Sequence, residues 1–196
     1  MDVKTIAVIG AGATGRGIAY AAALAGYRTV LEDISPHRLD EGVSFIRRTL
    51  EEEMARGGMT AEQKEKALAN LSTAGSVEDA CRLADLLIET VAEEMEIKLE
   101  IFTIFDKFAK PDAILATTTS SLPIAEIAVI TFRTENCIGM RFSHPVPKLE
   151  RLDVVRALES SDATVAACVE VGRRMGAEVT VVREGSGVSS AAGSTQ

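Results

Sequence analysis

The amino-acid sequence predicts an α/β fold built on a doubly wound, mostly parallel sheet. Three observations lead to this prediction. Short runs of apolar and β-branched residues alternate with amphipathic helical segments along the chain. A glycine-rich turn, Gly10-Ala-Gly-Ala-Thr-Gly15, follows the first apolar run and opens a helical segment. Asp33 ends the next apolar run, 23 residues after Gly10. This succession of strand, glycine-rich turn, helix and carboxylate is typical of a Rossmann-type sheet.

The glycine-rich turn has the spacing of a loop that binds a dinucleotide. Gly10 would let the chain turn, Gly12 would let the backbone approach a pyrophosphate, and Gly15 would let the helix pack closely on the strand. The phosphates would lie on the helix N-terminus, where unpaired N–H groups and the helix dipole favour anions. Asp33 would bind the adenosine ribose. The residues assigned to the cofactor on this basis are Gly10, Gly12, Ala13, Thr14, Gly15 and Asp33. The alternative is a strand-turn-helix that binds nothing.

The composition is that of an ordinary globular protein and argues against several classes of partner. The chain has 196 residues, enough for one domain or a little more. The net charge of −8 argues against nucleic acid or an anionic membrane as the main partner. No apolar run reaches the roughly 18 residues of a membrane span, and the first strand begins too early for a signal peptide.

Three cysteines, Cys81, Cys137 and Cys168, are odd in number and lack the spacing of metal ligands. We expect them to be small buried hydrophobes in a reducing cytoplasm rather than ligands or nucleophiles. The sequence therefore predicts a cytoplasmic protein with no metal site.

After the opening strand, the first half of the chain predicts a helix over residues 14–25 that ends at Gly26. A second strand follows at about 28–32. Ser35-Pro36 then provides an N-cap with proline at the first helical position, and opens a long helix over 36–56.

Gly57-Gly58 ends this helix, and Thr60-Ala-Glu-Gln63 is a capping box for another helix that runs to about residue 70. The two helices form a helical hairpin inserted after the second strand. Such a hairpin would either cover a ligand or be solvated.

The second half of the chain continues the alternation. Further strands are expected at 71–73, 85–89, 113–116, 136–142, 152–155 and 178–182. Further helices are expected at 76–81, 94–108, 124–128 and 162–175, the last capped by Ser160 or Ser161. The helix over 94–108 should turn Met95, Leu99, Phe102 and Phe105 inward.

A polar run, Thr117-Thr-Thr-Ser-Ser121, follows one of these strands directly. Ligands bind at the carboxyl ends of strands in open α/β sheets. The run is therefore either part of a ligand site or a hydroxyl-rich cap on the next short helix.

Several motifs occur together in this chain: Gly10-Ala-Gly-Ala-Thr-Gly-Arg-Gly17, Asp33, Ile88-Glu-Thr-Val-Ala-Glu93 with Lys98, Thr119-Ser-Ser-Leu-Pro123, and the stretch from Phe142 to Pro147. Together they resemble the NAD-binding domain of the 3-hydroxyacyl-CoA dehydrogenases, over essentially residues 3–184. The resemblance implies a Rossmann domain that carries a helical hairpin, NAD as the cofactor and an acyl-CoA substrate. It also implies that Asp33 accepts the ribose hydroxyls and repels a 2′-phosphate, which favours NAD over NADP.

The resemblance assigns further residues to the site. Ala92, Glu93 and Lys98 would line the nicotinamide end of the cofactor, and Ser120 would hydrogen-bond the substrate oxygen near the hydride acceptor. The residues alone leave two alternatives open, a surface salt bridge between Glu93 and Lys98 and a helix cap for Ser120.

The sequence departs from the family at the expected catalytic base. In the family, a histidine in a His-Phe-x-Asn-Pro stretch takes the hydroxyl proton and a glutamate further along the chain orients it. Here the stretch reads Arg141-Phe-Ser-His-Pro145, and Asp153 is at the glutamate position. Arginine has a pKa above about 12 and offers no acceptor, so Arg141 cannot take a proton at neutral pH. We expect Arg141 to pair with Asp153, or to touch a phosphate or acyl carbonyl. His144 is either a displaced base or a polar turn histidine.

The expected organisation is a NAD-binding domain over residues 1–184 and a disordered tail over 185–196. The family's helical C-terminal domain, which carries half of the acyl-CoA site and the usual dimer surface, is expected to be absent. One predicted function is a NAD-dependent oxidoreductase of fatty acid metabolism, which transfers a hydride between NAD and C3 of a 3-hydroxyacyl-CoA. The alternatives are a NAD-binding module that has lost its base, and a fragment that needs a separate helical partner. A homodimer also remains open.

Overall fold

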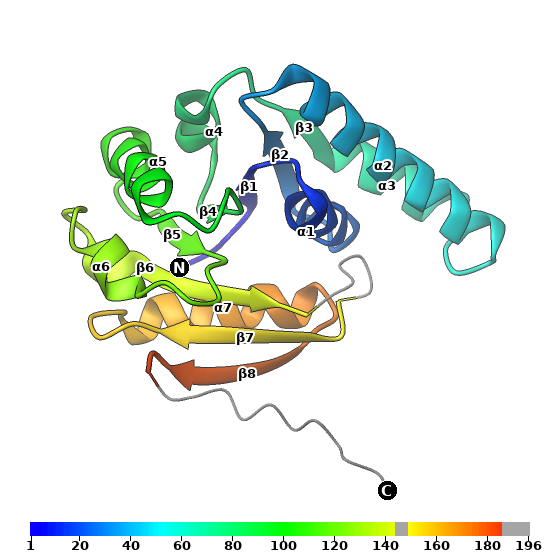
Figure 1. Ribbon diagram of the computed structural model, residues 1–196. Coiled ribbons are helices and arrows are strands. Elements are labelled where there is room, and N and C mark those ends of the chain that lie inside the picture. The colour runs from blue at the N-terminus through cyan, green and yellow to red at the C-terminus, as the bar shows by residue number, and fades with distance from the viewer. Residues whose placement is uncertain (144–148, 186–196) are drawn as a thin grey trace, which may run out of the picture.

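The computed structural model of the chain describes residues 1–143 and 149–185. Its eight strands form one sheet in the order β3-β2-β1-β4-β5-β6-β7-β8 (Figure 1). The strands are β1 Thr5–Ile9, β2 Arg28–Glu32, β3 Leu71–Thr73, β4 Leu86–Glu89, β5 Ile114–Thr117, β6 Cys137–Phe142, β7 Arg151–Arg156 and β8 Glu178–Arg183. Neighbouring strands are parallel except β6 and β7. The predicted doubly wound, mostly parallel sheet is confirmed, and its order reverses between β1 and β4.

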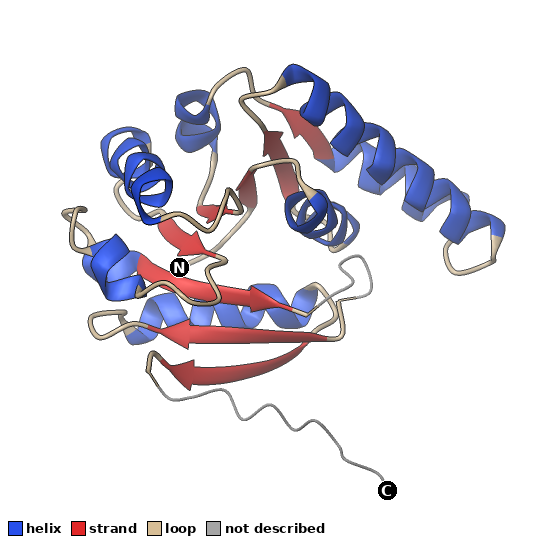
Figure 2. Ribbon diagram, viewed as in Figure 1, coloured by secondary structure: helices blue, strands red, loops and turns tan. Residues whose placement is uncertain are grey.

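Helices cover both faces of this sheet (Figure 2). They are α1 Ala13–Leu24, α2 Pro36–Ala55, α3 Ala61–Asn70, α4 Val77–Leu83, α5 Met95–Phe108, α6 Ile124–Ala128 and α7 Asp162–Arg174. One buried cluster joins the sheet to α1, α2, α3 and α7, and a second joins the opposite face to α4, α5 and α6. Strands buried on both sides explain why the sequence shows near-continuous apolar runs there.

The helical hairpin formed by α2 and α3 extends away from the sheet (Figure 1). Ser35 caps α2 by accepting a hydrogen bond from the Arg38 amide, and Thr60 and Gln63 form the predicted capping box of α3. Ile46 and Leu50 of α2 are buried against the rest of the molecule. The inner face of the hairpin therefore contributes to the core.

Most predicted boundaries agree with the structure within two residues, and the differences have local causes. Asn136 is not in β6, because Thr134–Asn136 form a turn of 3-10 helix before it. Ser161 caps α7, whereas the Ser160 hydroxyl donates to the Cys137 carbonyl. In α5, Phe102 and Phe105 are fully buried as expected, but Leu99 is only partly buried and Lys98 takes a fully buried position instead.

The three cysteines are free and buried, as predicted. Burial raises the pKa of Cys81 and Cys168 to about 12 and that of Cys137 to about 11. Each side chain therefore stays a neutral thiol at physiological pH and acts as a small hydrophobe.

Candidate cofactor site

The glycine-rich turn lies at the carboxyl end of β1, where the strand order reverses. Gly10 has a φ of 104°, in a region that side chains rarely adopt, and its amide donates to the Glu32 carbonyl oxygen at 2.8 Å. A Cβ at Gly15 would lie 1.8 Å from the Gly10 carbonyl oxygen. These two glycines are therefore required by the turn itself.

Gly12 differs from both, because a Cβ added there would meet no heavy atom within 4 Å. It is the N-cap of α1, and no side chain caps this helix end. Ala13 is exposed and Thr14 is partly exposed beside it. The first turn of α1 thus presents backbone N–H groups next to open space, the arrangement that binds anions.

Asp33 lies next to this turn, as the sequence predicted. One carboxylate oxygen accepts from the Ala11 amide at 2.8 Å, and the other accepts from the Ser35 amide at 2.9 Å. The side chain is only partly buried. The acid is therefore held in place by two backbone amides while keeping an accessible side, at the position where a ribose would be bound.

Glu93 organises the second half of the candidate site. Its Oε1 accepts hydrogen bonds from the Thr119 hydroxyl at 2.7 Å and from the Ser120 and Ser121 amides at 2.9 and 3.1 Å. Burial alone would raise the pKa of Glu93, but these donors outweigh it and lower the pKa to about 2. The carboxylate is therefore charged at neutral pH and fixes the polar segment that follows β5.

The salt bridge between Glu93 and Lys98 that the sequence left open as an alternative is present, but it does not lie on the surface, because Lys98 is buried. Its ammonium nitrogen lies 2.8 and 2.9 Å from the two carboxylate oxygens of Glu89, and 3.4 Å from Oε2 of Glu93. Sequence reasoning missed Glu89, although an acid that ends an apolar strand nine residues before a lysine was a readable signal. It also missed Thr90, whose hydroxyl donates to the Gly10 carbonyl at 3.0 Å.

Ser120 is exposed in the segment that Glu93 holds, and it does not cap α6. The N-cap of α6 is Pro123, and the Glu184 carboxylate accepts from the Ile124 and Ala125 amides instead. The helix-cap alternative for Ser120 was therefore wrong. Ala92 is also exposed, in the loop that leads from β4 to α5.

The expected ion pair between Arg141 and Asp153 was wrong as well. The two residues are direct neighbours in the register of β6 and β7. The Arg141 Nε nevertheless donates to the Thr119 carbonyl oxygen at 3.0 Å, and the ion pairs among the described residues do not include Asp153. Arg141 thus joins the segment organised by Glu93. His144 lies outside the described residues, as does the predicted tail from residue 186 onward.

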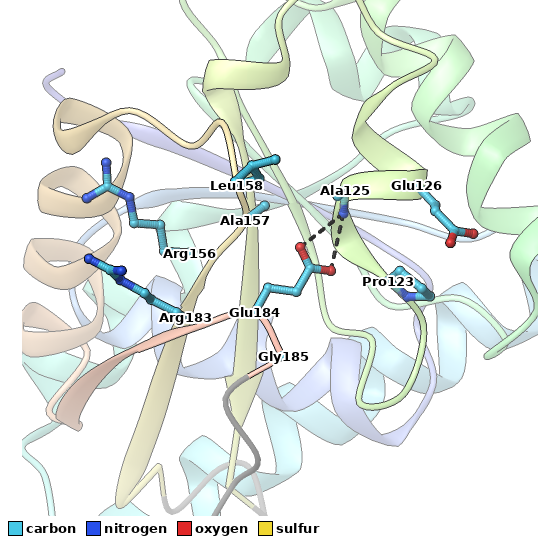
Figure 3. A pocket seen from close by; sticks show the side chains of 9 residues that line it. All are labelled: Pro123, Ala125, Glu126, Arg156, Ala157, Leu158, Arg183, Glu184 and Gly185. Atoms are coloured by element: carbon cyan, nitrogen blue, oxygen red, sulfur yellow. Dashed lines mark hydrogen bonds between the residues drawn. The ribbon is translucent and has the colours of Figure 1, made fainter.

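A separate hollow of about 630 Å³ lies between α6 and the carboxyl ends of β7 and β8. Figure 3 shows the Glu184 carboxylate turned toward Ala125, while Arg156 and Arg183 extend away from it. The Arg156 guanidinium is 2.6 Å from the Asp162 carboxylate. None of the residues lining this hollow belongs to the glycine-rich turn or to the segment Thr119–Ser121.

Within the described parts of the chain, no helix is both long and apolar enough to cross a membrane. The same residues contain no group of three or more His, Cys, Asp or Glu side chains arranged to hold a metal ion. The site described above is built from backbone amides, hydroxyls, Asp33, Arg141 and one buried lysine with its two glutamates.

Comparison with known proteins places this geometry in a family. A 3-hydroxybutyryl-CoA dehydrogenase of Bradyrhizobium diazoefficiens is 40% identical over 179 residues, which are 91% of this chain and 61% of that protein. A probable 3-hydroxybutyryl-CoA dehydrogenase of Bacillus subtilis is 35% identical over 184 residues, or 94% of this chain and 64% of that protein. The chain thus spans less than two thirds of either relative.

The crystal structure of an (S)-3-hydroxybutyryl-CoA dehydrogenase from Ralstonia eutropha superposes with a TM-score of 0.88 at 31% identity, over 93% of this chain and 64% of that one. The family model for the NAD-binding domain of 3-hydroxyacyl-CoA dehydrogenases matches residues 5–185. This chain is therefore a member of the family of 3-hydroxyacyl-CoA dehydrogenase NAD-binding domains.

Proposed function

We propose that the chain holds NAD across the carboxyl edge of its sheet and serves as the cofactor-binding part of a 3-hydroxyacyl-CoA dehydrogenase. The observation that carries the proposal is the pairing of an open, uncapped helix N-terminus at Gly12 with a fixed carboxylate at Asp33. The first suits a diphosphate and the second suits ribose hydroxyls. A carboxylate at this position also disfavours the 2′-phosphate of NADP.

The nicotinamide end is assigned to residues on the other side of the switch point. Ala92, Glu93 and Ser120 are exposed there, and Glu93 links the Ser120 hydroxyl to the buried Lys98 through a hydrogen bond and an ion pair. When bound, NAD supplies a hydride acceptor at its nicotinamide ring. The Ser120 hydroxyl would orient a substrate oxygen by hydrogen bonding, and Glu93 would keep the segment that carries Ser120 in place.

The substrate we propose is a 3-hydroxyacyl-CoA, within fatty acid metabolism in the cytoplasm. The named relatives are 3-hydroxybutyryl-CoA dehydrogenases, which supports this class of substrate. Three free, buried cysteines are compatible with a reducing compartment. The proposal also includes a homodimer of this chain. Analytical ultracentrifugation would show it as a species of twice the mass of one chain.

Arg141 favours a second candidate, a domain that binds NAD without turning over substrate by itself. Arg141 stands at the family's base position, offers no acceptor, and donates its Nε hydrogen to the Thr119 carbonyl. A proton acceptor for the substrate hydroxyl would have to come from another residue, for which His144 and Asp153 are the candidates in this chain.

One experiment separates the two candidates. NAD binding is measured by calorimetry, and NADH oxidation with acetoacetyl-CoA is followed in the same preparation. Binding with turnover supports the dehydrogenase, and binding without turnover supports the NAD-binding domain. If turnover is present, His144→Ala should abolish it if His144 is the base, and equal rates would eliminate that role.

A further inference from the structure

A buried glutamate lies at the cofactor edge of the sheet and has no place in the function proposed above. Glu89 ends β4, where it is in register with Ile9 of β1 and Thr117 of β5. Its side chain is 0% exposed. The carboxylate accepts from the Val91 amide at 2.6 Å, from Lys98 Nζ at 2.8 and 2.9 Å, and from the Thr117 hydroxyl at 2.7 Å. Every donor belongs to a different segment of the site.

Two routes of hydrogen bonds and ion pairs lead from Glu89 to the segment that carries Ser120. In the first, Lys98 contacts Oε2 of Glu93, while Oε1 of Glu93 accepts from Thr119, Ser120 and Ser121. In the second, Thr117 donates to Glu89 and accepts from the Thr119 amide at 3.2 Å. Glu89 is therefore the common anchor of Lys98 and Thr117, the first residue of each route.

We propose that Glu89 is a positioning residue that fixes the nicotinamide end of the cofactor site through Lys98 and Thr117. It would touch neither cofactor nor substrate. This inference rests on the proposed function, because it takes Ala92, Glu93, Lys98 and Ser120 as the nicotinamide end.

A purely structural role explains Glu89 less well. A buried ion pair contributes little net stability compared with apolar side chains of similar volume, because both charges lose their hydration. A strand end that needed only packing would be filled as well by leucine and methionine. The ammonium of Lys98, held by Glu89, supplies a fixed positive charge that apolar side chains cannot. This charge lies next to Oε2 of Glu93, while Oε1 of Glu93 accepts from the loop amides.

The test compares NAD with ADP-ribose, which lacks the nicotinamide ring. Affinities of both ligands are measured by calorimetry for the wild type, for Glu89→Gln, and for Glu96→Gln as a matched control, since Glu96 is an exposed acid on the same helix as Lys98. We expect Glu89→Gln to raise the Kd for NAD about ten-fold. The Kd for ADP-ribose should stay within about two-fold, and Glu96→Gln should change neither.

In Glu89→Gln, unchanged NAD affinity or an equal loss of NAD and ADP-ribose affinity would overturn the inference. The fluorescence of bound NADH gives a second readout, because it reports on the nicotinamide surroundings and should move toward that of free NADH in the variant. If Glu89→Gln does not fold, Thr117→Val is the second variant, because it removes only the route through Thr117. It should lower the affinity for NAD by a smaller factor and leave the affinity for ADP-ribose unchanged. A Thr117→Val protein that binds NAD like the wild type contradicts the inference. A wild type that binds neither ligand contradicts the proposed function itself.

Discussion

Gly12 and Gly15 belong to the same turn, but protein atoms exclude a side chain only at Gly15. At Gly15 an added Cβ collides with the Gly10 carbonyl oxygen, whereas at Gly12 it meets no protein atom within 4 Å. We therefore predict that Gly12→Ala folds with a loss of about 1 kcal/mol or less, from the weaker N-cap. Its methyl group would enter the space assigned to the diphosphate, so its Kd for NAD should rise at least about ten-fold. Urea unfolding and calorimetry measure the two effects, and wild-type NAD affinity in this variant would contradict the assignment.

Glu32 offers a contrast to Glu89 at the residue scale. Both are in register with Ile9, and Glu32 is 3% exposed. Burial, together with the nearby charges of Asp33 and Glu78, raises the pKa of Glu32 from 4.5 to about 7.

The raised pKa predicts a stability that falls as pH rises. Between about pH 4.5 and 7 the folded state keeps a proton that the unfolded chain releases, so the free energy of unfolding falls as pH rises through this window. Above about pH 7 the folded protein carries the full cost of a charged, buried Glu32 carboxylate. Glu32→Gln removes that cost. The variant should be more stable than the wild type by about 1–3 kcal/mol at pH 8 and no more stable at pH 4. Urea unfolding of both proteins at the two pH values tests this, and a difference independent of pH would refute it.

At the scale of elements, the segment between β5 and α6 is held mainly by the Glu93 carboxylate. Thr119, Ser120 and Ser121 all donate to Oε1 of Glu93, and the Arg141 guanidinium holds the same segment through the Thr119 carbonyl. The helix that follows is capped from a distant part of the chain by Glu184. This segment is therefore ordered by contacts that are remote in sequence.

Protonation of Glu93 should loosen this segment at acid pH. Its pKa is lowered to about 2, so its stabilising effect is present above about pH 4.5 and is lost as pH falls toward 2. We predict that Glu93→Gln is less stable than the wild type by about 1 kcal/mol at pH 6, a modest value because the side chain is 39% exposed. The gap should narrow at pH 3. A gap that widens on acidification would count against this role of Glu93.

The elements show what a single sequence can and cannot predict. Caps, turn glycines and apolar runs are local signals, so the capping box at Thr60 and the short strand β3 were predicted within a residue or two. The partner of Arg141 was not, because it depends on which strands become neighbours. Arg141 and Asp153 do face each other in register, but an ion pair with partial exposure is worth little. The Arg141 guanidinium instead donates a hydrogen bond to the Thr119 carbonyl oxygen.

At the scale of the whole molecule, the domain is one eight-stranded sheet whose cofactor edge joins residues from both halves of the chain. The glycine-rich turn and Asp33 come from the first half, and Ser120 and Arg141 from the second. A ligand that spans this edge should therefore stabilise the entire fold.

NAD should accordingly raise the melting temperature. A ligand present at about 100 times its Kd stabilises the folded state by roughly 2.7 kcal/mol, which corresponds to several degrees for a domain of this size. Thermal scans with increasing NAD measure the shift. At the same concentration, ADP-ribose should raise the melting temperature by less than NAD does. A melting temperature that neither ligand changes would contradict cofactor binding.

The central claim is that this fold binds NAD through the uncapped end of α1 and the carboxylate of Asp33. Calorimetric titration of the wild-type protein with NAD and with NADP tests it most directly. We predict one NAD bound per chain, at least about ten-fold more tightly than NADP, because the 2′-phosphate would lie against a fixed negative charge. Absence of NAD binding, or NADP affinity equal to or greater than that for NAD, would contradict the account.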